Sequence, residues 1–352
     1  MTPADGQILL SICIPTYNRA ALLKEALDSV LAQLVGELRE EVEIVISDNA
    51  STDGTGELVE QKRKIPGLKL KYFRHPTNLG FDANVLKVVE RASGRYCWIL
   101  SDDDLMAAGA LRTLIGELAS TEGIDLFLCE KSDFLLTPDR PMRFRRIMNF
   151  TGGRVFDFRK VDNVEEYFRR NKRLIAYCNF LSNIVFRREK WGQVPAKDEY
   201  VGSKYIHLYV FQMLLWGREP GVLKYLPAVL VERRWGNDAS YDAAQRLAVD
   251  VKTYHRIAAA VFDDRRRIRQ IDGLVIRNDA FSWAVRLRAQ QPWRFWRETW
   301  PFLFRAYWDQ PLFWLKLAPL AVTPGWLLRL MRGAYRRRVK GEPIGLSELW
   351  EA

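Results

Sequence analysis

The hydrophobic and polar positions of the first 130 residues follow two alternating patterns. Short, continuous apolar runs predict buried strands, and stretches with an apolar residue at every third or fourth position predict helices. The expected strands are 9–14, 42–46, 68–73, 96–100 and 126–129. The expected helices are 20–34, one from about residue 55, 81–92 and 108–118. Strands that alternate with helices predict right-handed βαβ units and a mainly parallel sheet.

The pattern changes in the second half of the chain. Residues 137–173 carry several Pro, Gly and Arg residues, and we interpret them as a long excursion or hairpin that covers one edge of a site. Regular structure is expected again at 180–186 and 205–215, and everything beyond Ala243 is expected to be helical. The predicted class is therefore α/β, with a Rossmann-like sheet domain at 1–240 and a helical C-terminal module at 241–352.

Charge divides the chain in a similar way. The 352 residues are 48% hydrophobic with a net charge of +11, which is a globular composition with a basic excess. Residues 252–340 hold 19 Lys and Arg against 6 Asp and Glu, whereas residues 1–251 hold 35 against 34. This asymmetry predicts an anionic partner for the C-terminal module.

The cysteines and the N-terminus indicate a reducing compartment. The four cysteines are widely separated inside apolar runs, and no pair has the spacing of a metal site, so we expect buried, reduced thiols. These are Cys13, Cys97, Cys129 and Cys178. The N-terminus lacks the basic flank, apolar stretch and small-residue cleavage site of a signal peptide. The cytoplasm is the expected location.

Polar residues follow each of the first four predicted strands, at 15–19, 48–54, 75–80 and 102–104. Each segment alone has the composition of an ordinary turn. Together they place polar groups on successive strand ends along one crevice, where open α/β sheets bind ligands.

Three consecutive carboxylates, Asp102, Asp103 and Asp104, follow the apolar run 96–100 directly. An isolated acidic triplet is more often a solvated turn. At the end of a buried strand, however, neighbouring carboxylates ionise together only if a cation compensates them. Mg²⁺ and Mn²⁺ prefer oxygen ligands and share them with phosphates. The triplet therefore predicts a Mg²⁺ or Mn²⁺ site.

Segments 13–19, 47–55, 78–80 and 101–104 resemble the family 2 glycosyltransferases of the GT-A fold. The resemblance covers about residues 8 to 120. A weaker likeness continues to about residue 240, where segments 180–188, 205–207 and 234–238 are similar to abequosyltransferase-type sugar transferases of O-antigen assembly. The resemblance implies a nucleotide-sugar donor, a divalent metal and inverting transfer.

The resemblance also implies roles for individual residues. Asp48 would bond the base, Asp102 would lie against the ribose, and Asp103 would hold the metal on the diphosphate. Asp104 would be a further ligand or an orienting group. The family often has an acid where Ser101 stands, so the assignment could move by one position. The other donor-binding residues implied are Pro15, Thr16 and Tyr17 around the nucleoside, with Arg19 and Asn78 beside them.

Two further regions carry less specific predictions. Arg234 lies in a loop that often closes over the donor in this family, so it is either a diphosphate contact or an arginine on a solvated loop. Ser182 and Asn183 are expected on the acceptor side.

Inverting transfer needs a base that accepts the proton of the attacking hydroxyl. His207 stands where many family members have an Asp, and its unperturbed pKa of about 6.5 suits the task. A single His on an apolar helix is, however, more often a packed core residue. Asp198 and Glu199 are the alternative bases.

Seven of the twelve tryptophans lie between 283 and 326, interleaved with arginines, and the chain continues into the basic run 336–340. The apolar stretch 311–328 is interrupted by Lys316, Pro319 and Pro324, so it does not predict a transmembrane span. Aromatic faces with cationic flanks favour a helix in the headgroup layer of an anionic membrane. The alternative is packing against the first domain or a second subunit. No nucleic-acid fold accompanies the basic residues.

The sequence therefore predicts a metal-dependent inverting glycosyltransferase at the inner face of the cell membrane. Its acceptor would be a saccharide on a polyprenyl diphosphate lipid, as in surface polysaccharide synthesis. A nucleotidyltransferase is the alternative enzyme, but residues 15–19 lack its Gly-rich phosphate loop. A non-catalytic partner that binds nucleotide sugar is the alternative from another class.

Overall fold

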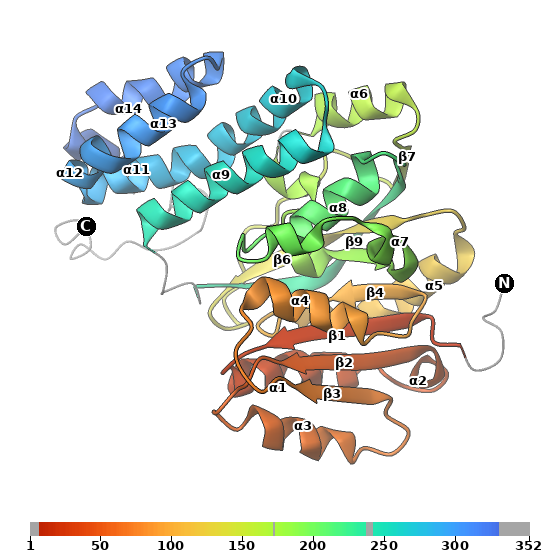
Figure 1. The fold of residues 1–352 in the computed structure, drawn as a ribbon. Coiled ribbons are helices and arrows are strands. Elements are labelled where there is room, and N and C mark those ends of the chain that lie inside the picture. The colour runs from red at the N-terminus through yellow and green to blue at the C-terminus, as the bar shows by residue number, and fades with distance from the viewer. Residues whose placement is uncertain (1–6, 172, 237–241, 331–352) are drawn as a thin grey trace. The chain divides into compact units, whose positions relative to one another are not determined.

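The computed structural model describes residues 7–171, 173–236 and 242–330 (Figure 1). The chain divides into two compact units. The first, which we call the sheet unit, comprises 1–139, 145–171 and 175–235; the second, the helical unit, comprises 140–144, 172–174 and 236–352. The predicted boundary at 240 falls in the stretch 237–241, outside the described residues.

The first half of the sheet unit is a parallel sheet in the order β3-β2-β1-β4. Leu10 of the central strand lies opposite both Val42 and Tyr96. The strands are β1 (Leu10–Thr16), β2 (Val42–Asp48), β3 (Leu70–Arg74) and β4 (Tyr96–Ile99). The helices are α1 (Ala20–Leu31), α2 (Leu38–Glu41), α3 (Thr55–Arg63), α4 (Phe81–Glu90) and α5 (Ala110–Ser120). The predicted βαβ pattern is confirmed.

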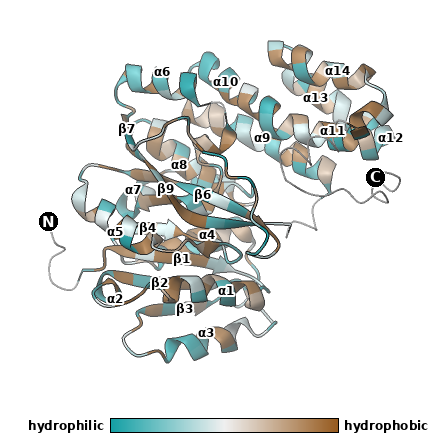
Figure 2. Cartoon of the chain, turned by 180° about the vertical axis from the view of Figure 1, so that it is seen from behind, coloured by the Kyte–Doolittle hydropathy of each residue, from teal (hydrophilic) through white to brown (hydrophobic). Residues whose placement is uncertain are grey.

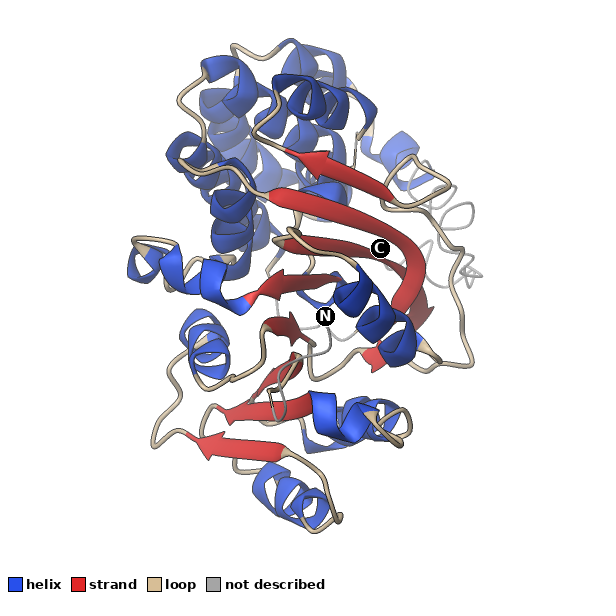
Figure 3. Cartoon of the chain, turned by 90° about the vertical axis from the view of Figure 1, so that its right-hand side faces the viewer, coloured by secondary structure: helices blue, strands red, loops and turns tan. Residues whose placement is uncertain are grey.

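The second half of the sheet is mixed. β4 continues through β8 (Ile184–Arg187) to β6 (Leu126–Leu135), β9 (Val222–Trp235) and β5 (Leu105–Met106), while β7 (Arg154–Asp157) pairs with β9. β6 and β9 are parallel, and the pairs β4–β8, β6–β8, β5–β9 and β7–β9 are antiparallel. Figure 3 shows these strands in one twisted sheet with helices on both sides.

Three differences from the sequence prediction lie in this half. β6 continues to Leu135 instead of ending at Cys129, and β9 extends far beyond the apolar run at its centre. The expected excursion contains β7 and an amphipathic helix, α6 (Val161–Arg170). The remaining helices of the sheet unit are α7 (Arg188–Gln193) and α8 (Ile206–Trp216).

Burial explains why the central strands are almost continuously apolar. Every residue of β1, β2 and β4 is buried, because helices cover the sheet, and these strands are mostly brown in Figure 2. Glu43, a charged residue inside β2, accepts hydrogen bonds from Ser11 and Ser93 and pairs with Lys71 at 2.8 Å. A buried carboxylate is tolerated only when partners of this kind replace water.

The helical unit is helical from Ala243 to the end of the described residues, as predicted. Asp242 begins it by accepting hydrogen bonds from the amides of Ala244 and Gln245 at 3.1 and 3.0 Å, which caps the first helix. π-helical turns join several of the later segments. The helices are α9 (Ala243–Val261), α10 (Arg265–Val275), α11 (Phe281–Gln290), α12 (Pro292–Arg294), α13 (Trp300–Tyr307) and α14 (Ala318–Val322).

Buried polar groups also occur in the helical unit. Asp250 forms an ion pair with Arg246, which lies one turn earlier in α9, at a distance of 3.0 Å. Asp279 is half-buried, and its partial removal from water, together with the charge of Asp250, raises its pKa to about 7. Among the described residues, no helix is both long enough and apolar enough to cross a bilayer. All four cysteines are free, buried thiols.

Candidate active site at the strand ends

The loops that follow β1 and β2 are joined by hydrogen bonds. The backbone amide of Asn18 donates to Ser51 Oγ at 2.9 Å, and the amide of Thr52 donates to the side-chain oxygen of Asn18 at 2.8 Å. Asn18 has a φ of 50°, a conformation that Asn tolerates better than most residues. These bonds fix the first polar segment, and Tyr17 stays 43% exposed within it.

Asp48 ends β2 and is fully buried. One carboxylate oxygen accepts the amide of Ser51 at 2.8 Å, and the other accepts the hydroxyl of Tyr72 from β3 at 2.6 Å. Burial and this hydrogen bond raise the pKa of Tyr72, which stays a neutral donor. Arg74 lies 3.9 Å from the same carboxylate. Asp48 is therefore oriented by its neighbours at the position predicted to meet the base.

Asn78 stabilises the loop before α4 through hydrogen bonds. Its side-chain oxygen accepts hydrogen bonds from Asn49 at 2.7 Å and from the amide of Gly80 at 2.8 Å. Asn49 in turn accepts the amide of Leu79 at 2.7 Å. The predicted contact of Asn78 with the donor stays a prediction, and these contacts show that it connects the second and third strand-end loops.

Asp102 lies where the first and fourth strand ends meet. It is 5% exposed and accepts hydrogen bonds from Thr16 Oγ1 at 2.8 Å and from Arg19 Nη1 at 3.1 Å. Burial raises its pKa to about 6, although the positive charge of Arg19 opposes the shift. The structure thus brings Thr16, Arg19 and Asp102 together, as predicted residues of one site.

Asp103 is the most accessible carboxylate of the triplet, with 17% of its side chain exposed. One oxygen accepts Ser101 Oγ at 2.6 Å, and the other accepts the same Arg19 Nη1 atom at 3.0 Å. A guanidinium cation therefore already lies against the oxygen of Asp103.

Asp104 points into the protein. It is 1% exposed and accepts the hydroxyl of Ser182 at 2.6 Å and the backbone amide of Arg234 at 3.1 Å. Burial, and after it the charge of Asp103, raises its pKa to about 7. Both oxygens of Asp104 thus anchor the acidic loop, residues 101–104, to the 3-10 turn η2 (Leu181–Asn183) before β8 and to the end of β9. This favours the orienting role over the ligand role among the two that we predicted.

Ser182 and Asn183 are buried instead of lining an open acceptor surface. Ser182 also accepts the amide of Ser101 at 3.0 Å, and its carbonyl accepts the indole N–H of Trp98 at 2.6 Å. Asn183 donates to the carbonyl of Cys129 at 3.2 Å. Both residues position the acidic loop and the sheet behind it.

The side chain of Arg234 also contacts the acidic loop, through the carbonyl of Asp103. This side chain, 3% exposed, donates to the carbonyls of Asp103 and Leu136 and pairs with Glu25 at 2.6 Å. Because its guanidinium is buried among protein groups, the structure does not favour the predicted diphosphate contact. Asn237 and Asp238 of the same predicted loop lie outside the described residues.

His207 is 4% exposed in α8, with Nε2 3.3 Å from the carbonyl oxygen of Asn179. Its ring packs edge-on against Phe81 and Phe211, with centroids 6.2 and 6.3 Å apart. These contacts match the packed core histidine that we set against the catalytic base, and the base role stays a prediction.

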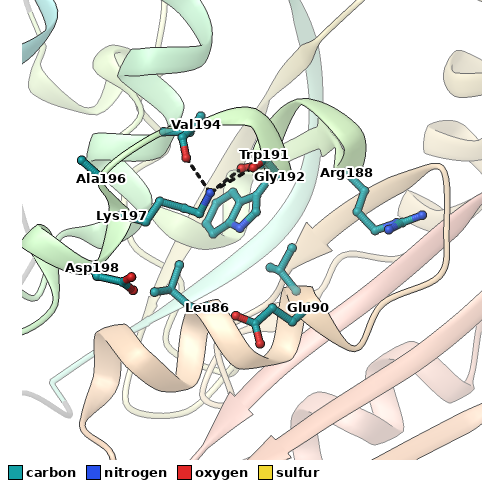
Figure 4. Close-up of a pocket in the computed structure, with 10 residues that line it drawn as sticks. Leu86, Glu90, Arg188, Trp191, Gly192, Val194, Ala196, Lys197 and Asp198 are labelled. Atoms are coloured by element: carbon teal, nitrogen blue, oxygen red, sulfur yellow. Dashed lines mark hydrogen bonds between the residues drawn. The ribbon is translucent and has the colours of Figure 1, made fainter.

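The alternative base Asp198 lines a hollow that is drawn in Figure 4. This hollow, of about 430 Å³, lies between the later turns of α4, from Leu86 to Glu90, and the segment that contains Trp191 and Lys197. The Lys197 ammonium donates to three backbone carbonyls there. Asp198 therefore faces the part of α4 remote from the strand-end loop where this helix begins.

Sequence analysis missed a charged and aromatic cluster at the ends of β6 and β9. The carboxylate of Asp133 forms ion pairs with Lys131 at 2.5 Å and with Arg233 at 2.7 Å. The guanidinium of Arg233 lies over the rings of Phe180 and Trp235, 5.2 and 4.1 Å from their centroids. Burial alone would raise the pKa of Asp133, but the charges of Arg233 and Lys131 hold it below its usual value. The only sequence signal was charge at alternate positions of a strand.

The donor set at Asp103 fits a divalent metal that binds together with a diphosphate. Mg²⁺ is typically held by one or two carboxylates plus substrate phosphates and water. In residues 7–171, 173–236 and 242–330, no group of three His, Cys, Asp or Glu side chains is arranged to hold a metal. The Arg19 cation against Asp102 and Asp103 shows that this pair attracts positive charge.

Comparison with known proteins gives a consistent result. Residues 11–189 match the model of the family described as glycosyl transferase family 2. The abequosyltransferase RfbV of Salmonella typhimurium is 32% identical over 254 residues, which cover 71% of this chain and 74% of that protein. A GalNAc(5)-diNAcBac-PP-undecaprenol beta-1,3-glucosyltransferase of Campylobacter jejuni is 36% identical over 107 residues, 30% of this chain and 33% of that protein.

Solved structures share the fold. TarS 1-349 of S. aureus in complex with UDP-GlcNAc superposes with a TM-score of 0.61 at 15% identity, over 93% of this chain and 88% of that chain. The mannosyltransferase PcManGT of Pyrobaculum calidifontis, in complex with GDP-Man and Mn²⁺, gives a TM-score of 0.54 at 17% identity, over 86% and 88%. The expected GT-A architecture is confirmed.

Proposed function

Since the chain belongs to glycosyl transferase family 2, we propose that it transfers a sugar, with inversion, from a nucleotide-sugar donor to a saccharide on a polyprenyl diphosphate lipid. The observation that carries the proposal is the meeting of strand-end loops at Asp102 and Asp103, which Thr16 and Arg19 contact from the first loop. The family match makes a nucleotidyltransferase a poor alternative.

We assign the donor to these strand-end loops. Asp48, oriented by Tyr72 and Ser51, would accept a hydrogen bond from the base. Asp102, oriented by Thr16, would bond the ribose. Asp103 would hold Mg²⁺ or Mn²⁺ on the diphosphate, and PcManGT, which shares the fold, is seen with GDP-Man and Mn²⁺. When bound, the metal would neutralise negative charge on the departing nucleoside diphosphate.

We assign the acceptor to the cluster of Lys131, Asp133, Arg233, Phe180 and Trp235. The backbone links this cluster to the acidic loop, because Arg233 precedes the residue whose amide bonds Asp104, and Phe180 stands two positions before Ser182. Aromatic faces and fixed charges together offer both stacking and hydrogen bonds to a sugar. The Campylobacter relative, named for a PP-undecaprenol acceptor, supports a lipid-linked acceptor.

We also propose that the helical unit attaches to the cytoplasmic face of an anionic membrane. Ten of the nineteen exposed large hydrophobic side chains among the described residues lie between 293 and 330. Trp293, Trp296 and Phe304 are all exposed, and arginines stand between them in the sequence. Exposed apolar patches of this kind mark interaction surfaces, and a cationic surround favours acidic lipids. The basic run 336–340 lies outside the described residues.

The test is an assay of the purified full chain with Mn²⁺, a bacterial lipid extract and each of UDP-, GDP-, CDP- and dTDP-sugars. We expect one donor class to release its nucleoside diphosphate and to leave its sugar in the lipid fraction. Asp103→Asn should lower this turnover at least about 100-fold. Donor binding without turnover in any combination would instead favour the non-catalytic partner.

A further inference from the structure

A single guanidinium nitrogen of Arg19 bridges the carboxylates of Asp102 and Asp103. Arg19 Nη1 lies 3.1 Å from Asp102 Oδ1 and 3.0 Å from Asp103 Oδ2. Arg19 stands at the start of α1, and 39% of its side chain is exposed. A long, partly exposed side chain of this kind can change partners without disturbing the helix that carries it.

The positive charge of Arg19 compensates the repulsion between the carboxylates of Asp102 and Asp103. Asp102 and Asp103 are adjacent in the chain, and Asp102 is almost fully buried. Two neighbouring carboxylates repel each other when both are ionised, and an opposite charge within about 4–6 Å removes that penalty. Arg19 supplies the charge that a metal ion would otherwise supply.

We infer that Arg19 is an internal counter-cation that a divalent ion must displace from Asp103, so that metal and donor diphosphate bind cooperatively. The inference rests on the proposed function, in which Asp103 holds the metal. Asp103 Oδ1 is hydrogen-bonded to Ser101, and Oδ2 is the atom that contacts Arg19. A metal that binds Oδ2 competes with the guanidinium for the same lone pairs and repels it.

The donor diphosphate favours the metal over Arg19 at Asp103. A diphosphate offers the displaced guanidinium a new partner, because the planar fork of arginine donors binds phosphate oxygens well. Asp102 keeps its hydrogen bond from Thr16 after Arg19 leaves, so it does not follow the side chain. By thermodynamic linkage, the donor raises metal affinity by the same factor as the metal raises donor affinity.

Mn²⁺ binding to the full chain tests the inference without any turnover. Free Mn²⁺ is measured by electron paramagnetic resonance, alone and with the nucleoside diphosphate that gives the largest thermal shift. We expect wild type to bind Mn²⁺ weakly alone and about tenfold or more tightly with the nucleotide. Arg19→Gln should bind Mn²⁺ alone about tenfold more tightly than wild type and should gain less from the nucleotide.

Two control variants separate displacement from general charge effects. Arg19→Lys keeps a cation near the pair and should stay close to wild type. Arg74→Gln removes a positive charge that contacts Asp48 instead, at 3.9 Å, and should change Mn²⁺ affinity much less than Arg19→Gln. Thermal unfolding checks that each variant is folded. If Arg19→Gln unfolds, Arg19→Met gives the same comparison.

The outcomes distinguish the two proposals. If Asp103→Asn abolishes Mn²⁺ binding while Arg19→Gln binds Mn²⁺ no more tightly than wild type, Arg19 is not a competitor and the inference is overturned. If Asp103→Asn leaves Mn²⁺ binding unchanged, the proposed metal role of Asp103 fails as well.

Discussion

Ser182 Oγ donates to Asp104 Oδ2 at 2.6 Å, which joins two buried side chains 78 positions apart in the sequence. The same hydroxyl accepts the amide of Ser101 at 3.0 Å. One small residue thus fixes both ends of the acidic segment, and the orientation of Asp103 between them depends on it.

Replacing Ser182 with Ala should therefore loosen the acidic loop. The variant leaves a buried carboxylate oxygen and a backbone amide without their partner, which costs about 1–3 kcal/mol of unfolding free energy. Urea unfolding measures the loss, and donor affinity should fall with it. Ser120→Ala, at an exposed helix end, is the matched control. Equal unfolding free energies for the two variants would contradict the anchoring role.

His207→Gln should lower stability but not turnover. The ring is packed between Phe81 and Phe211, so its loss disturbs the core. Turnover of the folded variant should stay within about threefold of wild type, whereas loss of a general base costs about 10²–10⁴-fold. Initial rates of donor consumption, corrected for folded protein, decide between the two. A drop of a hundredfold would restore His207 as the base.

The half-buried Asp279 should make the helical unit less stable at alkaline pH. Its pKa is about 7 in the folded state, above the usual carboxyl value, so the folded state holds an extra proton at lower pH. Its contribution to stability is full below the unfolded pKa of about 3.9 and is lost as pH rises through about 7. The loss should be a few kcal/mol at most.

Denaturant unfolding at pH 5, 7 and 9 measures this effect. Asn resembles the protonated carboxyl, so Asp279→Asn should show a smaller fall in unfolding free energy between pH 5 and 9 than wild type. Asp309→Asn, at an exposed position, serves as the control and should keep the wild-type slope. Parallel pH profiles for wild type and Asp279→Asn would rule the contribution out.

Removing aromatic side chains from the helical unit should weaken membrane binding. The double variant Trp293→Ser and Trp308→Ser removes two rings that are 62% and 58% exposed. Sedimentation with vesicles containing phosphatidylglycerol should decrease at least about tenfold, and salt should weaken the wild type further. Val161→Ser removes an apolar side chain of the sheet unit that is 72% exposed, and it should sediment as wild type does. Sedimentation of the double variant like wild type would oppose attachment through this face.

The first half of the fold could be predicted because local patterns determine it. β1, β2 and β4 are continuous apolar runs, and the helices between them repeat with the helical period, so the element order follows from periodicity. β9 escaped prediction because Lys224, Pro227 and Glu232 interrupt its apolar positions. α6 has a polar composition, so the sequence predicts only an excursion or hairpin over this segment.

The site was only partly predictable. Which residues stand at the strand ends is visible in the sequence, and Thr16, Arg19, Asp102 and Asp103 do meet. Where a side chain points depends on partners that are distant in the chain. Asp104 accepts a hydrogen bond from the buried Ser182, 78 positions away, and Arg234 pairs with Glu25, 209 positions away. No local sequence pattern encodes contacts at these separations.

The contacts of Arg234 also bear on how this enzyme could be re-engineered. Its guanidinium reaches α1 through Glu25, the acidic loop through the Asp103 carbonyl, and the end of β6 through Leu136. A chimaera that exchanges only the first half of the sheet unit for that of a relative would separate Arg234 from the native surroundings of Glu25 and Asp103. A crossover placed after Gly236 moves Arg234 together with all three partners and should yield the more stable hybrid.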